Sequence, residues 1–239
     1  MSPAYHSLAF STILEIEIEL LPYFSTLQLV RWSRVCRRAQ QGVQRFIAVA
    51  YSLERHLQLY GLQSNDVMSF RYLQRRTGMV ISGLSGLQFL ARVPIEGPPL
   101  TLVVELWYML HIVDWLQNRS YRVVSTNEFR STVPFGMAKH PVRRLFRHRH
   151  GLCIVMMQKN EHQVQLVGGN QAAAGIVLNY ENTAVQNLIT HEKAYCLFPK
   201  ETLEEFVAHE YHPAGISTSP DVGSIWSLPL EEAGWRSGY

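Results

Sequence analysis

The residues that suggest a chemical function lie between residues 78 and 107. Met79 to Ser82 predicts a buried strand, Gly83 to Gly86 a tight turn, and Leu87 the start of a short helix. A glycine turn lets the backbone approach a bound group, and the N–H groups at a helix start favour phosphate. The turn is not a Walker loop, since no Gly-Lys-Ser/Thr is present, nor a nucleophile elbow, since Leu87 stands where glycine is required. It is therefore either a phosphate-binding turn or an ordinary strand-to-helix connection.

The next predicted strand lacks the acidic residues that a metal-dependent phosphate site needs. It begins Pro-Pro-Leu-Thr at residues 98–101 and carries no acid before Glu105. Glu96 lies in the preceding loop, and Glu105 is ~13 Å from Thr101 along an extended strand. Hard cations require clustered oxygen ligands, mostly carboxylates in such sites. This spacing predicts no two-metal site.

The most charged stretch is residues 139–151, where arginines and histidines are interleaved with Leu145 and Phe146. Its arginines are Arg143, Arg144, Arg147 and Arg149. Such a cluster binds phosphates or RNA by releasing counterions, or it is a solvated face beside the sheet. Salt-sensitive binding of generic RNA distinguishes the two.

Histidines and cysteines give no metal-ligand pattern. His148, His150 and Cys153 are close in sequence, and His209 and His212 are three apart on a predicted helix. Neither group has the spacing of HExxH or of paired Cys-x-x-Cys. We expect surface histidines, no bound metal and no cofactor.

Composition indicates a globular protein with one large domain or two smaller ones. Of the 239 residues, 47% are hydrophobic and 17% are charged, and the net charge of +3 is too small to imply a polyanion partner for the whole chain. Cys36, Cys153 and Cys196 form no even disulfide set, which fits a reducing compartment. No apolar run approaches the roughly 20 residues that cross a bilayer. We expect a cytoplasmic or nuclear protein without a membrane partner.

The sequence predicts an α+β protein in three parts. Residues 8–60 are expected to form a small N-terminal helical bundle, residues 71–212 a mixed-sheet domain, and residues 213–239 an irregular tail rich in Gly, Ser and Pro.

Within the bundle, residues 16–20 alternate like a strand, yet the apolar spacing across residues 13–24 favours a helix. Residues 25–28 have the form of a capping box. One helical stripe extends over residues 43–60. A bundle of about fifty residues buries little surface, so we expect it to pack on the larger domain or a partner.

Within the larger domain, residues 106–116 are spaced for a core helix that covers the sheet. A strand is expected at residues 162–167, followed by a turn at 168–170. The apolar spacing in residues 184–198 predicts a packed helix with His191 near its exposed side.

The segment "ILEIEIELLPYFSTLQLVRWSRVCRR" resembles an F-box, the adaptor-binding motif of substrate receptors in cullin–RING ubiquitin ligases. Its most specific part is "SRVCRR", while Thr12-Ile13 stands where Leu-Pro usually opens the motif. The resemblance implies a helical surface for a protein partner, the ligase adaptor subunit. The residues implied to bind it are Glu15, Ile16, Leu20, Leu21, Leu29, Trp32, Val35 and Cys36. The alternative is that this stripe is the core of the bundle itself.

Residues 71–207 resemble the nucleotidyltransferase fold of fungal proteins that carry an F-box-like N-terminus. The resemblance rests on "SGLSGLQFL", on "GPPLTLVVELWYMLHIVDWLQNRSYRV" and on "VLNYENTAVQNLITHEKAYCLFPKETLEE". In active members a Gly-Ser turn holds the triphosphate, and three acids hold two Mg²⁺ ions ~3.5–4 Å apart. The resemblance places those acids at Pro99, Thr101 and Gln165, beside Gly83 and Ser85 of the turn.

A proline ring, a hydroxyl and an amide cannot replace three anionic ligands. The two resemblances together imply a non-enzymatic interaction protein, an F-box-type substrate receptor whose nucleotidyltransferase-like domain is catalytically silent. Two alternatives remain. Residues 139–151 would make the chain a nucleotide- or RNA-binding protein, and acids not paired above would make it an atypical nucleotidyltransferase.

Overall fold

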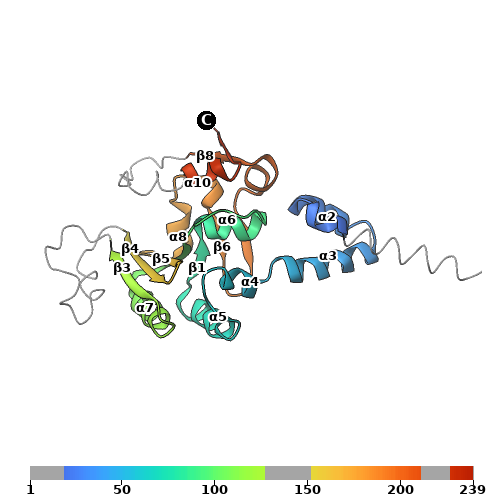
Figure 1. Ribbon diagram of the computed structural model, residues 1–239. Helices are drawn as coiled ribbons and strands as arrows, with labels where there is room; N and C mark the ends of the chain where they lie inside the picture. The colour runs from blue at the N-terminus through green and yellow to red at the C-terminus, as the bar shows by residue number, and fades with distance from the viewer. Residues whose placement is uncertain (1–18, 127–151, 211–226, 239) are drawn as a thin grey trace, which may run out of the picture.

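A computed structural model of the chain describes residues 19–126, 152–210 and 227–238. In these residues a small helical part adjoins a larger part built on a seven-stranded mixed sheet (Figure 1). The α+β class expected from the sequence is confirmed. Within the described ranges, no helix combines the length and the apolar character that a membrane span requires.

The helical part, residues 19–50, is called the helical segment below. It contains η1 (Leu21–Tyr23), α2 (Thr26–Ser33) and α3 (Arg37–Ala50). The capping box at the start of α2 is confirmed, because the Gln28 N–H donates to Ser25 Oγ at 3.2 Å and the Ser25 N–H donates to Gln28 Oε1 at 2.7 Å. This reciprocal pair satisfies two N–H groups that a helix start otherwise leaves without partners.

The stripe predicted across residues 43–60 is not one helix. α3 ends at Ala50, and α4 (Leu53–Gln58) begins after Ser52, whose hydroxyl accepts the Arg55 N–H at 3.4 Å. Serine is a preferred N-cap, so the chain stops one helix and starts another at this point. The side chains of α4 then join the core of the larger part.

The helical segment has a small core of its own. Leu21, Leu29 and Val43 are buried there, and Phe24 and Trp32 pack against them. The rings of Phe24 and Trp32 meet edge to face, with their centroids 6.1 Å apart. This cluster is separate from the two cores of the larger part. The segment therefore carries little buried apolar surface, as its length predicts.

The larger part, called the sheet domain below, begins at α4. The order of its main sheet is β3-β4-β5-β2-β1-β6-β7, with β2 and β5 parallel and the other neighbours antiparallel. These strands are β1 (Val80–Ser82), β2 (Leu100–Glu105), β3 (Arg122–Thr126), β4 (Cys153–Lys159), β5 (His162–Gly169), β6 (Asn187–Ile189) and β7 (Ala194–Cys196). The helices are α5 (Asp66–Thr77), α6 (Gly83–Ala91), η2 (Leu106–Tyr108), α7 (Met109–Gln117), α8 (Ala173–Leu178), η5 (Thr183–Val185), η6 (Glu201–Glu205) and α10 (Ser227–Glu232).

The two faces of the sheet pack into different cores. Along β2, Leu102 lies in the core that α4, α5 and α7 share, while Val103 lies in the core formed with α6 and α8. This follows from the alternation of side chains along a strand. Because β2 is covered on both faces, it consists mostly of apolar residues.

Residues 184–198 do not form the expected helix. They contain η5 and the antiparallel pair β6–β7, and β6 joins the sheet beside β1 with Ile81 opposite Ile189. The hairpin turn is closed by Thr190 Oγ1, which accepts the Lys193 N–H at 3.1 Å. The helical spacing of the apolar residues was misleading because pairing with β1 decides their conformation.

Two expectations about glycines are also wrong. α6 begins at Gly83 itself, so residues 83–86 are the first helical turn rather than a separate loop. β5 continues through Gly168 and Gly169, where a turn was expected. Glycine is needed inside this strand because a Cβ at Gly168 would lie 2.1 Å from Met109 Sδ of α7.

The expectation of an irregular tail is wrong for residues 227–238. β9 (Arg236–Gly238) pairs in parallel with β8 (Val207–His209), which places His209 on a strand rather than a helix. Trp235 is buried, and its indole Nε1–H donates to the Thr202 carbonyl at 2.9 Å. The end of the chain is thus part of the second core.

His56 of α4 is a buried histidine that no sequence motif marks out. Its ring lies 5.3 Å from that of Tyr60 and 5.2 Å from that of Phe89. Burial lowers the pKa of His56 from 6.5 to about 4, because the imidazolium cannot be solvated there. The folded protein therefore holds His56 neutral.

This predicts acid sensitivity. The unfolded chain binds a proton at His56 near its ordinary pKa while the folded chain does not, so stability is lost as the pH falls from 6.5 towards 4. His56→Phe should reduce the loss of unfolding free energy between about pH 7 and about pH 4.5 by roughly 2 kcal/mol, measured by urea unfolding. His111→Phe, at an exposed histidine, should keep the pH dependence of the unmodified protein. Equal pH dependence in all three proteins would refute the assignment.

Candidate functional site

Three neutral polar side chains form a row across the sheet where β1 ends. Ser82, Thr101 and Gln165 are register partners on β1, β2 and β5. They point to the α6 and α8 face, because Val103 and Val167, two residues further along their strands, lie in that core. All three are buried. We call them the polar row.

The first turn of α6 is bonded to this row. Gly83 has φ 66°, which suits glycine and turns the chain directly from β1 into the helix. The Ser85 hydroxyl donates to the Ser82 carbonyl at 2.9 Å and accepts the Thr101 N–H at 3.0 Å. Ser85 is fully buried, so its two bonds fix the start of α6 against β2.

Thr101 and Gln165 are paired by their side chains as well as by register. The Thr101 hydroxyl donates to Gln165 Oε1 at 3.3 Å and also lies 3.5 Å from the Pro99 carbonyl. The Ser82 hydroxyl donates to the Val185 carbonyl at 3.3 Å. Each polar row side chain therefore has a neutral partner within the protein.

Tyr180 is a further buried polar group on this face. It lies in the core that contains α6 and α8, and burial raises the pKa of its phenol above the ordinary value, an effect that Ser82 partly offsets. The phenol stays protonated under ordinary conditions, so no anionic oxygen is added to the site.

Four of the five residues assigned to the nucleotide site from the sequence lie together: Gly83, Ser85, Thr101 and Gln165. Pro99 precedes β2, half-buried, and has no ligand atom in its side chain. Glu96 is exposed in the loop before β2, and Glu105 pairs with Gly169 at the opposite end of the strand. Among the described residues, no group of three or more His, Cys, Asp or Glu side chains could hold a metal ion.

The polar row supplies hydrogen bonds and no charge. Two-metal phosphoryl transfer depends on carboxylates that hold the cations and on cations that neutralise the developing charge. The side chains here are neutral, buried and hydrogen-bonded within the protein, so they provide neither function. What the arrangement does is anchor α6 to the centre of the sheet.

The residues assigned to partner binding fall into two groups in the helical segment. Leu21 and Leu29 are buried in the core of the segment, and Trp32 is half-buried against Phe24. Leu20, Val35 and Cys36 are exposed, Val35 to 65%. Glu15 and Ile16 lie outside the described residues. The stripe read from the sequence therefore contains both core and surface positions.

The exposed apolar residues Tyr23 and Val30 are among those of the segment that were missed. Tyr23, 85% exposed, precedes α2, and Val30 lies seven residues further on. Tyr23 ends η1 and Val30 lies within α2, with the extended residues Phe24 and Ser25 between the two helices, so no single helical spacing marks them in the sequence.

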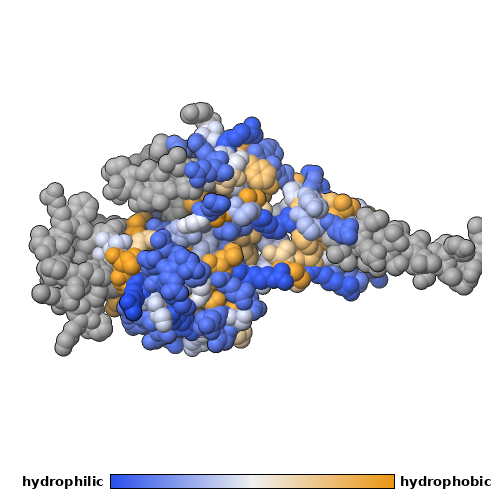
Figure 2. Space-filling model, in the orientation of Figure 1, coloured by the Kyte–Doolittle hydropathy of each residue, from blue (hydrophilic) through white to orange (hydrophobic). Residues whose placement is uncertain are grey.

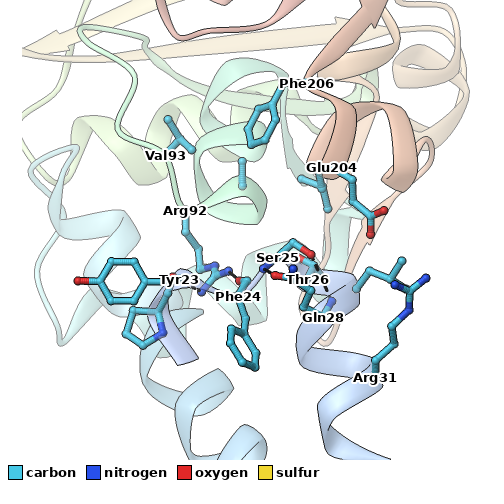
Figure 3. Close-up of a pocket in the computed structure, with 14 residues that line it drawn as sticks. Tyr23, Phe24, Ser25, Thr26, Gln28, Arg31, Arg92, Val93, Glu204 and Phe206 are labelled. Atoms are coloured by element: carbon cyan, nitrogen blue, oxygen red, sulfur yellow. Dashed lines mark hydrogen bonds between the residues drawn. The ribbon is translucent and has the colours of Figure 1, made fainter. Parts of the chain in front are cut away.

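A cleft of about 460 Å³ separates the helical segment from the sheet domain (Figure 3). Its walls come from η1 and the first turns of α2, from the end of α6, and from η6. Arg92, at the end of α6, extends across it: Nη1 donates to the Pro22 carbonyl at 3.4 Å and Nη2 donates to the Phe24 carbonyl. The sequence contained no signal for this arginine.

The arginines assigned to phosphate or RNA binding, Arg143, Arg144, Arg147 and Arg149, lie outside the described residues. His148, His150 and His212 also lie outside them. None of the three cysteines, all within the described residues, is in a disulfide; Cys36 is exposed and Cys153 is buried. His191 lies in the turn of the β6–β7 hairpin, where its imidazole Nε2 is 3.3 Å from a carboxylate oxygen of Glu192.

No protein-family model, curated protein or solved structure matches this chain. The arguments below therefore depend on the chain's own residues and on the geometry described above.

The bonds of Ser85 predict a measurable loss on truncation. Ser85→Ala removes the acceptor of the buried Thr101 N–H, which should lower the unfolding free energy by about 1–3 kcal/mol. Ser125→Ala, at an exposed serine of β3, should change it by less than about 0.5 kcal/mol. Urea unfolding of both variants measures the difference, and a cost for Ser85→Ala as small as that of Ser125→Ala would contradict the role given to its hydroxyl.

Proposed function

We propose that this chain is a non-enzymatic interaction protein, an F-box-type substrate receptor of a cullin–RING ubiquitin ligase with a catalytically silent nucleotidyltransferase-like domain. The observation that supports it best is the exposure of large apolar side chains on a segment that already has its own core. Tyr23 and Val35 are exposed while Leu21, Leu29 and Val43 fill the inside. Large apolar side chains that remain exposed although the core is complete favour binding to a partner protein.

The charge of the segment indicates what kind of partner fits. Residues 19–50 contain five arginines and one glutamate, and no lysine. Arg31, Arg34 and Arg37 are exposed. Arginine and aromatic residues are enriched in protein interfaces, whereas lysine is depleted. A protein surface that is apolar in the middle and acidic around it complements these residues, and we assign it to the ligase adaptor subunit.

The polar row supports the silent state of the sheet domain. Thr101 and Gln165 occupy positions that the resemblance gives to metal-binding acids, and they hydrogen-bond to each other. Burial also argues against a nucleotide at this place, because Ser85, Thr101 and Gln165 are occupied with protein partners and closed to solvent. In this proposal the domain is a folded platform that contacts the target protein.

Adaptor binding predicts a specific effect at Val35. Val35→Asp places a charge on an exposed apolar residue without disturbing the core of the segment. It should weaken binding of the purified adaptor subunit at least tenfold, about 1.4 kcal/mol, measured by calorimetry. Val124→Asp makes the same change at an exposed valine of β3 in the sheet domain and should bind like the unmodified protein. Absence of binding by the unmodified protein, or equal binding by the two variants, refutes the proposal.

A silent domain predicts no nucleotide transfer. Purified protein with Mg²⁺ or Mn²⁺ and labelled nucleoside triphosphates should give no incorporation above a blank, because the neutral polar row cannot hold the cations. Ser85→Ala provides the control for contamination. Incorporation by the unmodified protein that is lost in Ser85→Ala would make the chain an atypical nucleotidyltransferase.

A further inference from the structure

The helical segment is held against the sheet domain by few contacts. Its core of Leu21, Leu29 and Val43 is shared with no element of the sheet domain. The cleft of about 460 Å³ leaves part of the boundary without side-chain packing. Figure 2 shows apolar residues gathered at the narrow junction between the two parts. Packing of this extent does not by itself fix one orientation, since boundaries between small units permit relative motion unless they are large and apolar.

Arg92 makes directed contacts across this boundary. Its guanidinium donates to the carbonyls of Pro22 and Phe24 from two different nitrogens. It also lies over two rings, 5.3 Å from the centroid of Phe46 in α3 and 5.7 Å from that of Tyr51 at the end of α3. One side chain of the sheet domain therefore contacts both η1, ahead of α2, and the end of α3, and Figure 3 shows it between Tyr23 and Phe24.

The backbone of Arg92 is in a conformation that disfavours arginine. It is the C-cap of α6 with φ 58° and ψ 26°, in the left-handed region. Glycine is the usual residue at such a helix end, because it has no Cβ to clash with the carbonyl. The backbone conformation at this position favours glycine, yet the residue is arginine. Such a conflict indicates that contacts made elsewhere in the molecule require the arginine side chain.

A second left-handed residue beside the cleft gives a useful contrast. Phe206, after η6, has φ 52° and also lines the cleft. Its ring packs on Trp235 at 5.2 Å, within its own domain. The Phe206 ring thus packs within the sheet domain, whereas the Arg92 side chain contacts the helical segment on the other side of the boundary.

We propose that Arg92 is a positioning residue that fixes the orientation of the helical segment relative to the sheet domain. The planar guanidinium suits this role because it presents several donors in a rigid plane and stacks on aromatic rings. The functional meaning of the orientation rests on the proposed function, since it would set where a bound target lies relative to the adaptor. The structural role itself requires no partner.

The test separates orientation from stability. Spin labels are attached at Gln44→Cys on α3 and Met68→Cys on α5, both exposed positions, with Cys36→Ser and Cys196→Ser in the background. Pulsed electron paramagnetic resonance then measures the distribution of distances between the two labels, and so between the two parts, in the free protein. Arg92→Gly removes the steric strain of the left-handed backbone together with the guanidinium contacts. The distance distribution should therefore become at least about twice as wide as in the protein with Arg92. Hydrogen exchange at the amides of β2 and β5 should stay unchanged, because their pairing is untouched.

Asn160→Gly is the matched control. Asn160 is also left-handed, at φ 53°, but lies in the turn between β4 and β5, so the width should not change. An unchanged width in Arg92→Gly overturns the proposal, as does equal broadening in Asn160→Gly. Loss of protection in β2 and β5 would also overturn it, because Arg92 would then act through general stability. Failure of adaptor binding would leave these results unaffected, so the two proposals fail separately.

Discussion

The requirement that buried polar groups find partners governs the centre of this protein. At the end of β1 neutral groups satisfy this requirement. The Ser85 hydroxyl accepts the Thr101 N–H, and the Thr101 hydroxyl donates to the Gln165 side-chain carbonyl. Three carboxylates at one such place would repel one another and would need cations to balance them. Neutral side chains remove that need, so the sheet domain can fold around this place without a metal. This is the physical basis of our proposal that the sheet domain serves contact rather than catalysis.

The same reasoning separates the roles of the two parts. The sheet domain has two extensive cores, one on each face of β2 and β5, and can serve as a rigid body. The helical segment has a core of a few residues and still exposes Tyr23 and Val35. A small unit with apolar surface left over is stabilised when a partner covers that surface. The marginal core of the segment and the partner binding that we propose for it therefore have one physical cause, the apolar surface that the core leaves exposed.

The parts of the structure that could be predicted are those that local chemistry decides. The capping box at Ser25 and Gln28 follows from side chains that reach backbone groups within one turn. One non-local pair was also anticipated, on the resemblance rather than on local chemistry: Thr101 and Gln165 are register partners on β2 and β5. The hairpin at residues 187–196 was missed because β1 supplies its pairing from about a hundred residues away. Trp235 was missed for the same reason, since its partner Thr202 is distant in sequence.

Arg92 shows why the candidate site could be predicted only in part. Read locally, "LARVP" at the end of α6 gives a helix stop before Pro94 and no reason to notice the arginine. Its left-handed backbone costs roughly 1 kcal/mol, whereas each hydrogen bond from a charged group contributes about 1.5–3 kcal/mol and each ring contact about 0.5–1 kcal/mol. The balance favours arginine over glycine only when Pro22, Phe24, Phe46 and Tyr51 are brought to it by the fold. The reason for this residue thus lies in the arrangement of the two parts, which no local pattern contains.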